Sequence, residues 1–261
     1  MAKKKKIFPL MKLMVQFFVL SFIGLLSWAS FWWADYSNPM DNIEINFSET
    51  KVLDVNRYKS LLDEITNNDS SKLNLYEISA LIENHPYIKV ARVSRHYPSE
   101  IKIEIIEREP IAIVNIDPMI FLDENGFVLP DQGNIKNYNL PVMNNFNSDP
   151  KLYPQGELAL SVKVKECIDI LTRIQTNYPE LYKNLSYLEI TSSNEIKLIL
   201  DEFASNLPTH VYLGNNEIYT RIEILKEFES TLKPNKISDF SYLDMRFNNQ
   251  IIVKRHHSWV Q

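Results

Sequence analysis

The sequence contains a single cysteine, Cys167, and only five glycines among its 261 residues. One cysteine cannot form a disulfide within the chain, and it cannot build a cysteine-based metal cage. Five glycines leave little for the loops that cradle phosphate groups, and the serine-hydrolase, zinc-protease, P-loop and dinucleotide-binding motifs do not occur. The sequence therefore predicts no enzymatic site, no cofactor and no bound metal.

Basic residues are also fewer than acidic ones. The sequence has 28 Lys and Arg and 33 Asp and Glu, which give a net charge of −5. Proteins that mainly bind nucleic acid carry a basic surface, so we expect no nucleic acid among the partners. The charge is distributed unevenly. Residues 1–34 contain five lysines and no acidic residue, whereas residues 35–261 carry a formal charge of −10.

An uncharged apolar run from Leu13 to Ala34 follows the basic tip, which consists of residues 1–12. Its 22 residues, at about 1.5 Å each in a helix, span roughly 33 Å and can cross a hydrocarbon core of about 30 Å. Aromatic side chains suited to the lipid interface gather near its far end, at Trp28, Trp32 and Trp33. We therefore expect one transmembrane helix over residues 13–34, with membrane lipid as its partner, the lysines in the cytoplasm and the rest of the chain outside.

A cleaved signal peptide is the alternative, because Ser27 and Ala29 have the small side chains found at the −3 and −1 positions of a cleavage site. The apolar run nevertheless continues for five residues beyond Ala29, and it contains two further tryptophans there. These two features favour an uncleaved anchor.

Between residues 41 and 114 the pattern predicts a β-α-α-β-β unit. Apolar residues alternate with polar ones from Ile43 to Phe47, which is the period of a half-buried strand. Two amphipathic helices follow, the first with Asp54 as its N-cap and the second ended by His85-Pro86. The expected elements are a strand at 42–47, helices at 55–65 and 75–84, and strands at 88–96 and 100–106.

A longer unit of mixed helices and strands is expected over residues 115–255. Asn125-Gly126 predicts the tight turn of a hairpin within 121–129. The segment from Asp131 to Gln155 is rich in Asn and Pro and is expected to be a loop. The other expected elements are helices at 160–174 and 218–232, strands at 185–191, 195–200 and 211–213, a strand pair or one long strand at 242–254, and a tail at 256–261.

Several short segments carry a resemblance to a known family. They are His85-Pro86-Tyr87-Ile88, Tyr97-Pro98, Glu107-Arg108-Glu109-Pro110-Ile111-Ala112 (ERxPxA), Phe121-Leu122-Asp123-Glu124-Asn125-Gly126, Leu140-Pro141, Val211-Tyr212-Leu213-Gly214 and Tyr242-Leu243-Asp244-Met245-Arg246-Phe247. Their order and spacing resemble the FtsQ/DivIB family of cell division proteins over nearly the whole chain. The resemblance implies an α+β fold, in which the transmembrane helix precedes a POTRA domain (41–114) and a larger FtsQ-type β domain (115–255) built on a mainly antiparallel sheet.

The resemblance also implies a function. Members of this family are non-enzymatic bitopic scaffolds of the bacterial cytoplasmic (inner) membrane, located at the division septum. Their POTRA domain contacts an upstream division protein, and their β domain binds FtsB-like and FtsL-like bitopic partners, which are thereby linked to septal peptidoglycan synthesis. The competing hypothesis is a membrane-anchored extracytoplasmic cell-wall enzyme, which would need a deep pocket lined by carboxylates or histidines of perturbed pKa.

The final strand is expected at or near a sheet edge, because only a short polar tail follows it. An exposed edge suits β-augmentation, in which a partner strand pairs with the backbone and alternate side chains select it. A purely structural edge is the alternative. The resemblance favours binding and implies an apolar anchor at Phe247, backbone pairing from Asn249 to Lys254, and attraction of an acidic segment by Lys254 and Arg255. The expected partner-binding residues are Phe247, Asn249, Ile251, Ile252, Lys254 and Arg255.

Overall fold

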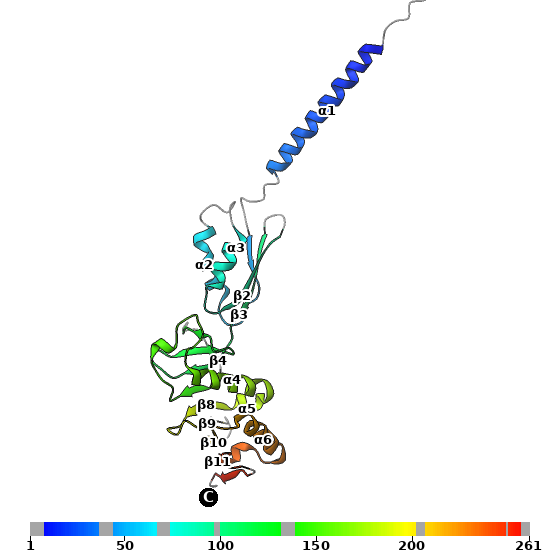
Figure 1. The fold of residues 1–261 in the computed structure, drawn as a ribbon. Coiled ribbons are helices and arrows are strands. Elements are labelled where there is room, and N and C mark those ends of the chain that lie inside the picture. The colour runs from blue at the N-terminus through cyan, green and yellow to red at the C-terminus, as the bar shows by residue number, and fades with distance from the viewer. Residues whose placement is uncertain are drawn as a thin grey trace, which may run out of the picture.

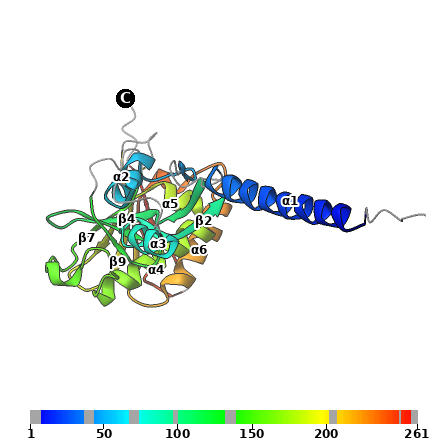
Figure 2. The ribbon, with the colours of Figure 1, turned by 90° about the horizontal axis from the view of Figure 1, so that it is seen from above.

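The structure, a computed structural model, describes residues 8–36, 44–66, 74–96, 100–131, 139–201, 207–248 and 250–256. The first element is one long helix, α1 (Phe8–Tyr36), which contains the expected anchor and extends beyond it at both ends. Its stretch from Met11 to Trp33 is long and apolar enough to cross a membrane, and none of that stretch is buried within the protein. The expected anchor residues Leu13, Trp28, Trp32 and Trp33 are all exposed. Figures 1 and 2 show α1 extending away from the folded body, which fits a membrane-anchored, single-pass protein.

The first folded unit is a three-stranded sheet on which two helices pack. Its elements are β1 (Glu44–Phe47), α2 (Val55–Thr66), α3 (Leu75–Glu83), β2 (Ile88–His96) and β3 (Glu100–Glu107). β3 lies between β1, which is parallel to it, and β2, which is antiparallel. The helices and the sheet share a buried core that includes Tyr58, Leu62, Ile78, Ile82, Ile101 and Ile103. This is the expected β-α-α-β-β order, and Asp54 caps α2 by accepting a hydrogen bond from the Asn56 amide (N to Oδ1, 2.8 Å).

The second unit is built on a nine-stranded sheet. Its strands are β4 (Pro110–Val114), β5 (Ile120–Asp123), β6 (Val128–Leu129), β7 (Val142–Asn144), β8 (Leu185–Ile190), β9 (Ile196–Leu200), β10 (Thr209–Gly214), β11 (Phe240–Asp244) and β12 (Ile252–Arg255). Their order across the sheet is β12-β11-β10-β9-β8-β7-β4-β5-β6. The pairs β4–β7, β7–β8 and β10–β11 are parallel, and the other neighbouring pairs are antiparallel. The observed fold class is therefore the expected α+β arrangement of an apolar helix, a small unit and a larger sheet.

α-Helices lie beside this sheet (Figure 1). They are α4 (Val162–Asn177), α5 (Pro179–Lys183) and α6 (Ile218–Thr231), and two 3₁₀ turns, η3 (Pro150–Leu152) and η4 (Ile237–Asp239), complete the unit. Apolar residues of α4 and α6 recur at helical spacing and pack with the inward side chains of the strands in one core. Cys167 lies on the buried side of α4 and is fully enclosed.

One expectation for this unit was wrong, and one left open is now decided. The segment from Asp131 to Gln155, expected to be a loop, contains β7 and η3 among its described residues. A strand of three residues shows no periodicity in the sequence, and β7 exists because it pairs on both sides, with β4 and with β8. The segment 242–254 is a strand pair, β11 and β12, and not one long strand.

The change from one sheet to the other falls between β3 and β4. The first unit was expected to extend to residue 114, but Pro110–Val114 pairs with β5 and β7 and so belongs to the nine-stranded sheet. The physical reason is burial, since four of the five β4 residues are buried and need cover on both faces. The division of the chain into two domains stays a prediction.

The ERxPxA segment lies where the two sheets meet. Glu107 stays within the first unit, where it accepts hydrogen bonds from the backbone amides of residues 51–53 and from Tyr58 Oη. Arg108 reaches the second unit instead. Its Nη1 pairs with Asp123 Oδ2 at 2.9 Å, and its guanidinium lies 3.7 Å from the centre of the Phe127 ring. Glu107 and Arg108 are adjacent in the chain, but Glu107 forms its contacts in the first unit and Arg108 in the second.

Apolar packing crosses the same joint. Phe121 and Leu129 belong to the nine-stranded sheet, yet their side chains are buried in the core of the first unit. Tyr87 Oη donates a hydrogen bond to the Pro130 carbonyl across the joint (2.8 Å). The two units are therefore in direct, buried contact.

Candidate partner-binding edge

β12 forms one edge of the nine-stranded sheet, because among the described strands it pairs only with β11. All four of its residues are exposed, including Ile252 (44%) and Val253 (40%). Of the strands labelled in Figure 1, β11 lies farthest from α1, so the β12 edge is at the distal end of the molecule. The structure thus places the final strand at an edge, as expected.

Two hydrogen bonds reveal which backbone groups of β12 face outward. Ser241 Oγ donates to the Lys254 carbonyl, and the His256 amide donates to the Asp239 carbonyl, both at 3.2 Å. Backbone groups alternate in direction along a strand, so those of residues 252, 254 and 256 face β11. The amides and carbonyls of Val253 and Arg255 therefore face the open edge.

A loop of residues 245–251 joins β11 to β12 and carries the expected anchor residue. The Phe247 side chain is 47% exposed, and it lies in this loop, not in a strand. Met245 is buried, and Ile251 packs against the large core, so neither of these apolar side chains faces the open edge. The loop presents Phe247 as its exposed apolar side chain.

The same loop forms one wall of a surface groove of about 560 Å³. The opposite wall comes from the first turns of α6. The lining residues are Glu217, Thr220, Arg221, Ile224, Met245, Phe247, Asn248, Gln250 and Ile251. Ile224 is 44% exposed, so it and Phe247 give both walls of the groove an accessible apolar side chain.

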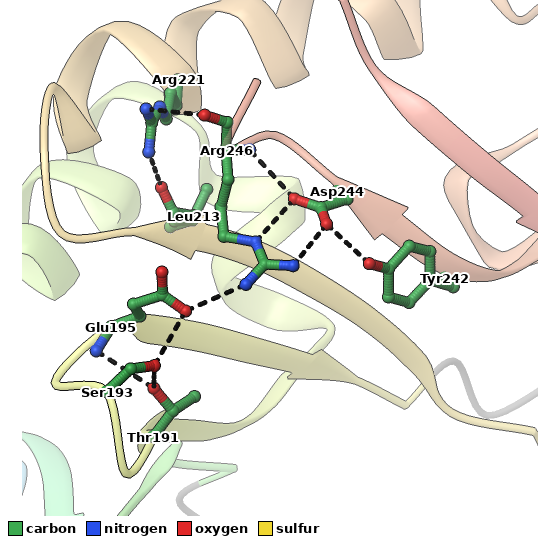
Figure 3. A network of polar contacts seen from close by, with 8 residues as sticks. All are labelled: Thr191, Ser193, Glu195, Leu213, Arg221, Tyr242, Asp244 and Arg246. Carbon is green, nitrogen blue, oxygen red and sulfur yellow. Dashed lines mark hydrogen bonds and ion pairs between the residues drawn. The ribbon is translucent and has the colours of Figure 1, made fainter. Parts of the chain in front are cut away.

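A network of polar contacts holds the start of this loop (Figure 3). Arg246 binds Asp244 through two nitrogens, Nε to Oδ1 at 2.9 Å and Nη2 to Oδ2 at 2.6 Å. Its third nitrogen, Nη1, reaches Glu195 Oε2 at 3.0 Å, and its guanidinium lies 5.2 Å from the centre of the Tyr212 ring. Tyr242 Oη donates to the same Asp244 Oδ2 (2.6 Å) that Arg246 Nη2 contacts. The loop is thereby tied to three neighbouring strand regions.

A second arginine ties the loop to the helix layer. Arg221 of α6 donates to the Leu213 carbonyl and, at 3.3 Å, to the Arg246 carbonyl. This approach depends on Gly214, whose φ is +79° and whose hydrogen points at the guanidinium. A Cβ at that position would lie 2.5 Å from Arg221 Nη1 and 3.2 Å from Arg246 Cγ. Glycine is the residue that combines positive φ with so close a contact.

Asp244 and Arg246 hold each other in the charged form. Hydrogen bonds from the Arg246 guanidinium lower the pKa of the Asp244 carboxyl to about 2. The same contact raises the pKa of Arg246, and hydrogen bonding to Asp244 raises the pKa of Tyr242. Lys254 and Arg255 differ, because among the described residues neither forms an ion pair with a carboxylate, although Arg255 lies 5.7 Å from the centre of the Phe240 ring.

The expected site residues are thus only partly gathered on β12. Ile252, Lys254 and Arg255 lie on the edge strand, Phe247 lies in the preceding loop, and Ile251 faces the core. Asn249 lies outside the described residues, and the expected backbone pairing from Asn249 to Lys254 stays a prediction. β12 begins only at Ile252, because the loop must first turn the chain back along β11.

Sequence reasoning missed the network around Asp244, Arg246 and Arg221. The signal was the Asp-x-Arg spacing of Asp244 and Arg246, two residues apart on the segment quoted for the family resemblance. Among the described residues, no three His, Cys, Asp or Glu side chains come together as a metal site would require.

A β-α-α-β-β unit after an apolar helix, joined to a large mixed sheet with an open distal edge, defines a membrane-anchored protein of the POTRA class. Comparison with protein families agrees, since residues 45–108 match the POTRA domain of the FtsQ type.

Curated relatives extend this similarity beyond the first unit. The chain is 26% identical over 183 residues to cell division protein FtsQ of Syntrophotalea carbinolica, and 24% identical over 184 residues to that of Geotalea daltonii. Each match covers 70% of this chain, but only 62% and 64% of those relatives. It is also 27% identical over 223 residues to cell division protein DivIB of Clostridium tetani, which covers 79% of each chain. The chain is therefore related to the FtsQ/DivIB family, as the resemblance predicted.

Proposed function

We propose that this protein is a bitopic, non-enzymatic scaffold of the bacterial division machinery and that its distal edge binds a partner strand. The observation that carries the proposal is the open edge of β12 in a chain similar to proteins named FtsQ and DivIB. These names support a role in cell division. The partners we propose are FtsB-like and FtsL-like bitopic proteins, which the scaffold links to septal peptidoglycan synthesis.

The binding mode we propose is β-augmentation at β12. The outward amides and carbonyls of Val253 and Arg255 offer a partner strand its backbone hydrogen bonds. Phe247 and Ile252 supply exposed apolar side chains in the loop and on the strand of that edge. Such contacts typically provide most of the binding free energy when they become buried at an interface.

Charge favours an acidic partner segment. Lys254 and Arg255 add two positive charges to β12, and β12 itself contains no acidic residue. Complementary charges of this exposed kind raise the association rate more than the final affinity. We therefore expect binding to slow as salt concentration rises.

The other end of the molecule has a separate role in this proposal. The POTRA-type unit recruits the protein through an upstream division protein, and α1 holds it in the bacterial cytoplasmic membrane at the septum. Support comes from the match of residues 45–108 to the FtsQ-type POTRA domain and from the exposed apolar stretch of α1. β2 ends the three-stranded sheet, so this unit also has an open edge among the described strands.

The competing hypothesis, a wall enzyme, finds no specific observation in its favour. The groove beside Phe247 contains Glu217 and Arg221, but Arg221 is engaged with backbone carbonyls. Asp244 is buried and strongly shifted, yet its pKa is lowered by Arg246 and it has no open space in which to transfer a proton.

The test is to measure binding of the full chain, held in lipid nanodiscs, to the FtsB-like protein of the same organism. Phe247→Ala should weaken binding by about 2 kcal/mol, or about thirtyfold, because it truncates an aromatic anchor. Tyr76→Ala is the matched control, since Tyr76 is 79% exposed but lies on α3 in the other unit. Unchanged binding by Phe247→Ala would rule out the proposed site.

A proline pair tests the strand itself. Val253→Pro removes an amide that faces the open edge, so it should weaken binding while thermal stability changes little. Ile252→Pro removes an amide that faces β11, so it should lower thermal stability. Equal losses of binding and of thermal stability in the two variants would contradict strand addition. In dividing cells, a fluorescent fusion should gather at the septum, and a uniform membrane signal would contradict the division role.

A further inference from the structure

We propose that α1 pairs with a second copy of itself inside the membrane. The contact face, called the α1 seam below, consists of Gln16, Leu20, Ile23, Ser27 and Ser30. The inference concerns the membrane-spanning helix alone, so it does not depend on the proposed function of the β12 edge.

The α1 seam has the spacing of a helix–helix contact. Its residues follow one another at intervals of four, three, four and three positions. This heptad spacing keeps all five side chains on one side of a helix, and two helices that share it pack along their length in a left-handed pair. All five side chains are exposed, and Figure 1 shows α1 extending away from the folded body. The face is therefore accessible to another helix in the membrane.

Polar and aromatic residues are segregated around α1. The apolar run from Leu13 to Ala34 contains one glutamine and three serines, and all of these except Ser21 lie on the α1 seam. The aromatic residues of the run all lie outside the seam, at Phe17, Phe18, Phe22, Trp28, Phe31, Trp32 and Trp33. Small and hydroxyl-bearing residues let two helices approach closely, whereas bulky rings on that face would hold them apart. The pattern therefore separates a side that faces lipid from a side that faces protein.

Gln16 indicates a partner independently of the small residues. It lies within the stretch from Met11 to Trp33 that can cross a membrane, and among the described residues no hydrogen bond engages its side chain. Hydrocarbon offers no hydrogen-bonding group, so an amide at this depth is stabilised by a neighbouring helix that supplies one.

The chemistry of the α1 seam fits a second copy of the same helix. Copies of one single-pass protein cross the membrane in the same direction, so each seam residue meets its own counterpart in a symmetric pair. Every polar group must then complement itself. The amide of Gln16 and the hydroxyls of Ser27 and Ser30 do so, because each both donates and accepts hydrogen bonds. The seam also contains no charged residue that would repel its counterpart.

The test is oxidative cross-linking of the full chain in lipid vesicles, with one cysteine introduced at a time. A disulfide requires two Cα atoms within about 7 Å, so it forms only where the two helices touch. Ser27→Cys and Ser30→Cys place the thiol on the α1 seam. Ser21→Cys is the matched control, because it replaces the same residue type about 140° away around the helix. The native Cys167 is fully enclosed and does not compete.

We expect a covalent dimer from Ser27→Cys and Ser30→Cys and mainly monomer from Ser21→Cys. Equal amounts of dimer from Ser21→Cys and Ser27→Cys would overturn the proposal, because they would indicate random collision. No dimer from either seam position would also overturn it. In membranes of the native cell, a cross-linked product that contains a different protein in place of the second copy would refute the choice of partner.

A second measurement follows self-association without a cross-link. Energy transfer between donor-labelled and acceptor-labelled copies is recorded as the protein is diluted with lipid. Gln16→Leu should weaken self-association about threefold, because it removes a hydrogen bond between the helices. Ser30→Phe should abolish the dimer by holding the backbones apart, whereas Ser21→Phe should leave it intact. Equal energy transfer in Ser30→Phe and wild type would contradict the α1 seam.

Discussion

Replacing Arg108 by methionine should destabilise the protein far more than removing an exposed ion pair at the same joint. The side chains of Arg108 and Asp123 are only 17% and 3% exposed, so the pair is largely desolvated. Removing one partner of a buried pair leaves an uncompensated charge and typically costs about 3–5 kcal/mol. In the variant the Asp123 carboxylate would keep two amide donors, from Asn125 at 2.9 Å and Phe127 at 2.8 Å. Because these donors still stabilise its charge, we expect a cost at the lower end of that range. Loss of the contact with the Phe127 ring adds about 1 kcal/mol. We therefore expect Arg108→Met to cost about 3–4 kcal/mol.

The matched control is Lys89→Met. Lys89 pairs with Glu124 across the same joint at 2.9 Å, but the two side chains are 42% and 53% exposed. An exposed pair of this kind is worth about 0–1 kcal/mol. The free energy of unfolding is measured by urea titration of the full chain, followed by labelling of the Cys167 thiol. Equal midpoints and slopes for Arg108→Met and Lys89→Met would refute the reasoning, because both ion pairs would then behave as exposed ones. Partial recovery in an Arg108→Met/Asp123→Asn double variant would identify the buried carboxylate as the origin of the cost.

Three further predictions concern the second unit. Burial raises the pKa of the Cys167 thiol to about 12, so native protein at pH 8 should resist a thiol reagent that labels the unfolded chain rapidly. Asp244 titrates at about 2 instead of 3.8, so its contribution to stability is present above pH 4 and is lost as the pH falls through 2. Urea titrations should show the advantage of wild type over Asp244→Asn shrinking across that interval. Gly214→Ala should lower the free energy of unfolding by about 1–3 kcal/mol in the same assay, because it combines positive φ with a close contact to Arg221. A Cβ at Gly126 meets no atom within 4 Å, so Gly126→Ala should cost only the free energy of holding alanine at positive φ.

Most of the secondary structure could be predicted from the sequence, because it follows from local patterns. The helices α2, α3, α4 and α6 have apolar residues at helical spacing, and in β3 the buried Ile101 and Ile103 alternate with half-buried polar residues. β7 and α5 could not be found in this way. They have three and five residues, and their stability comes from neighbours that are distant in the sequence.

The candidate site, too, could be predicted only where it follows from local sequence patterns. An edge position was expected for the last strand, and the order of the described strands across the sheet agrees. The loop between β11 and β12 does not follow, since Arg246 finds Glu195 across 51 residues of chain. Phe247 and Ile251 were both expected to serve the partner. The turn of this loop exposes the first side chain and directs the second into the core.

The strands of the larger sheet lie side by side along the long axis of the molecule. The number of strands therefore determines how far from the membrane the distal edge lies. Figure 1 shows β2 and β3 running along the long axis and the labelled strands β4, β8, β9, β10 and β11 lying successively farther from α1. The nine residues of β2 account for about 30 Å, and the six spacings from β4 to β12 for about 29 Å more. If, as proposed, a bitopic protein anchored beside this one pairs with β12, it has to project roughly 60 Å, which corresponds to about 40 residues of continuous helix. Its pairing segment would then lie at the end of a long stalk, and shortening that stalk by a few helical turns should separate the two proteins without altering either binding surface.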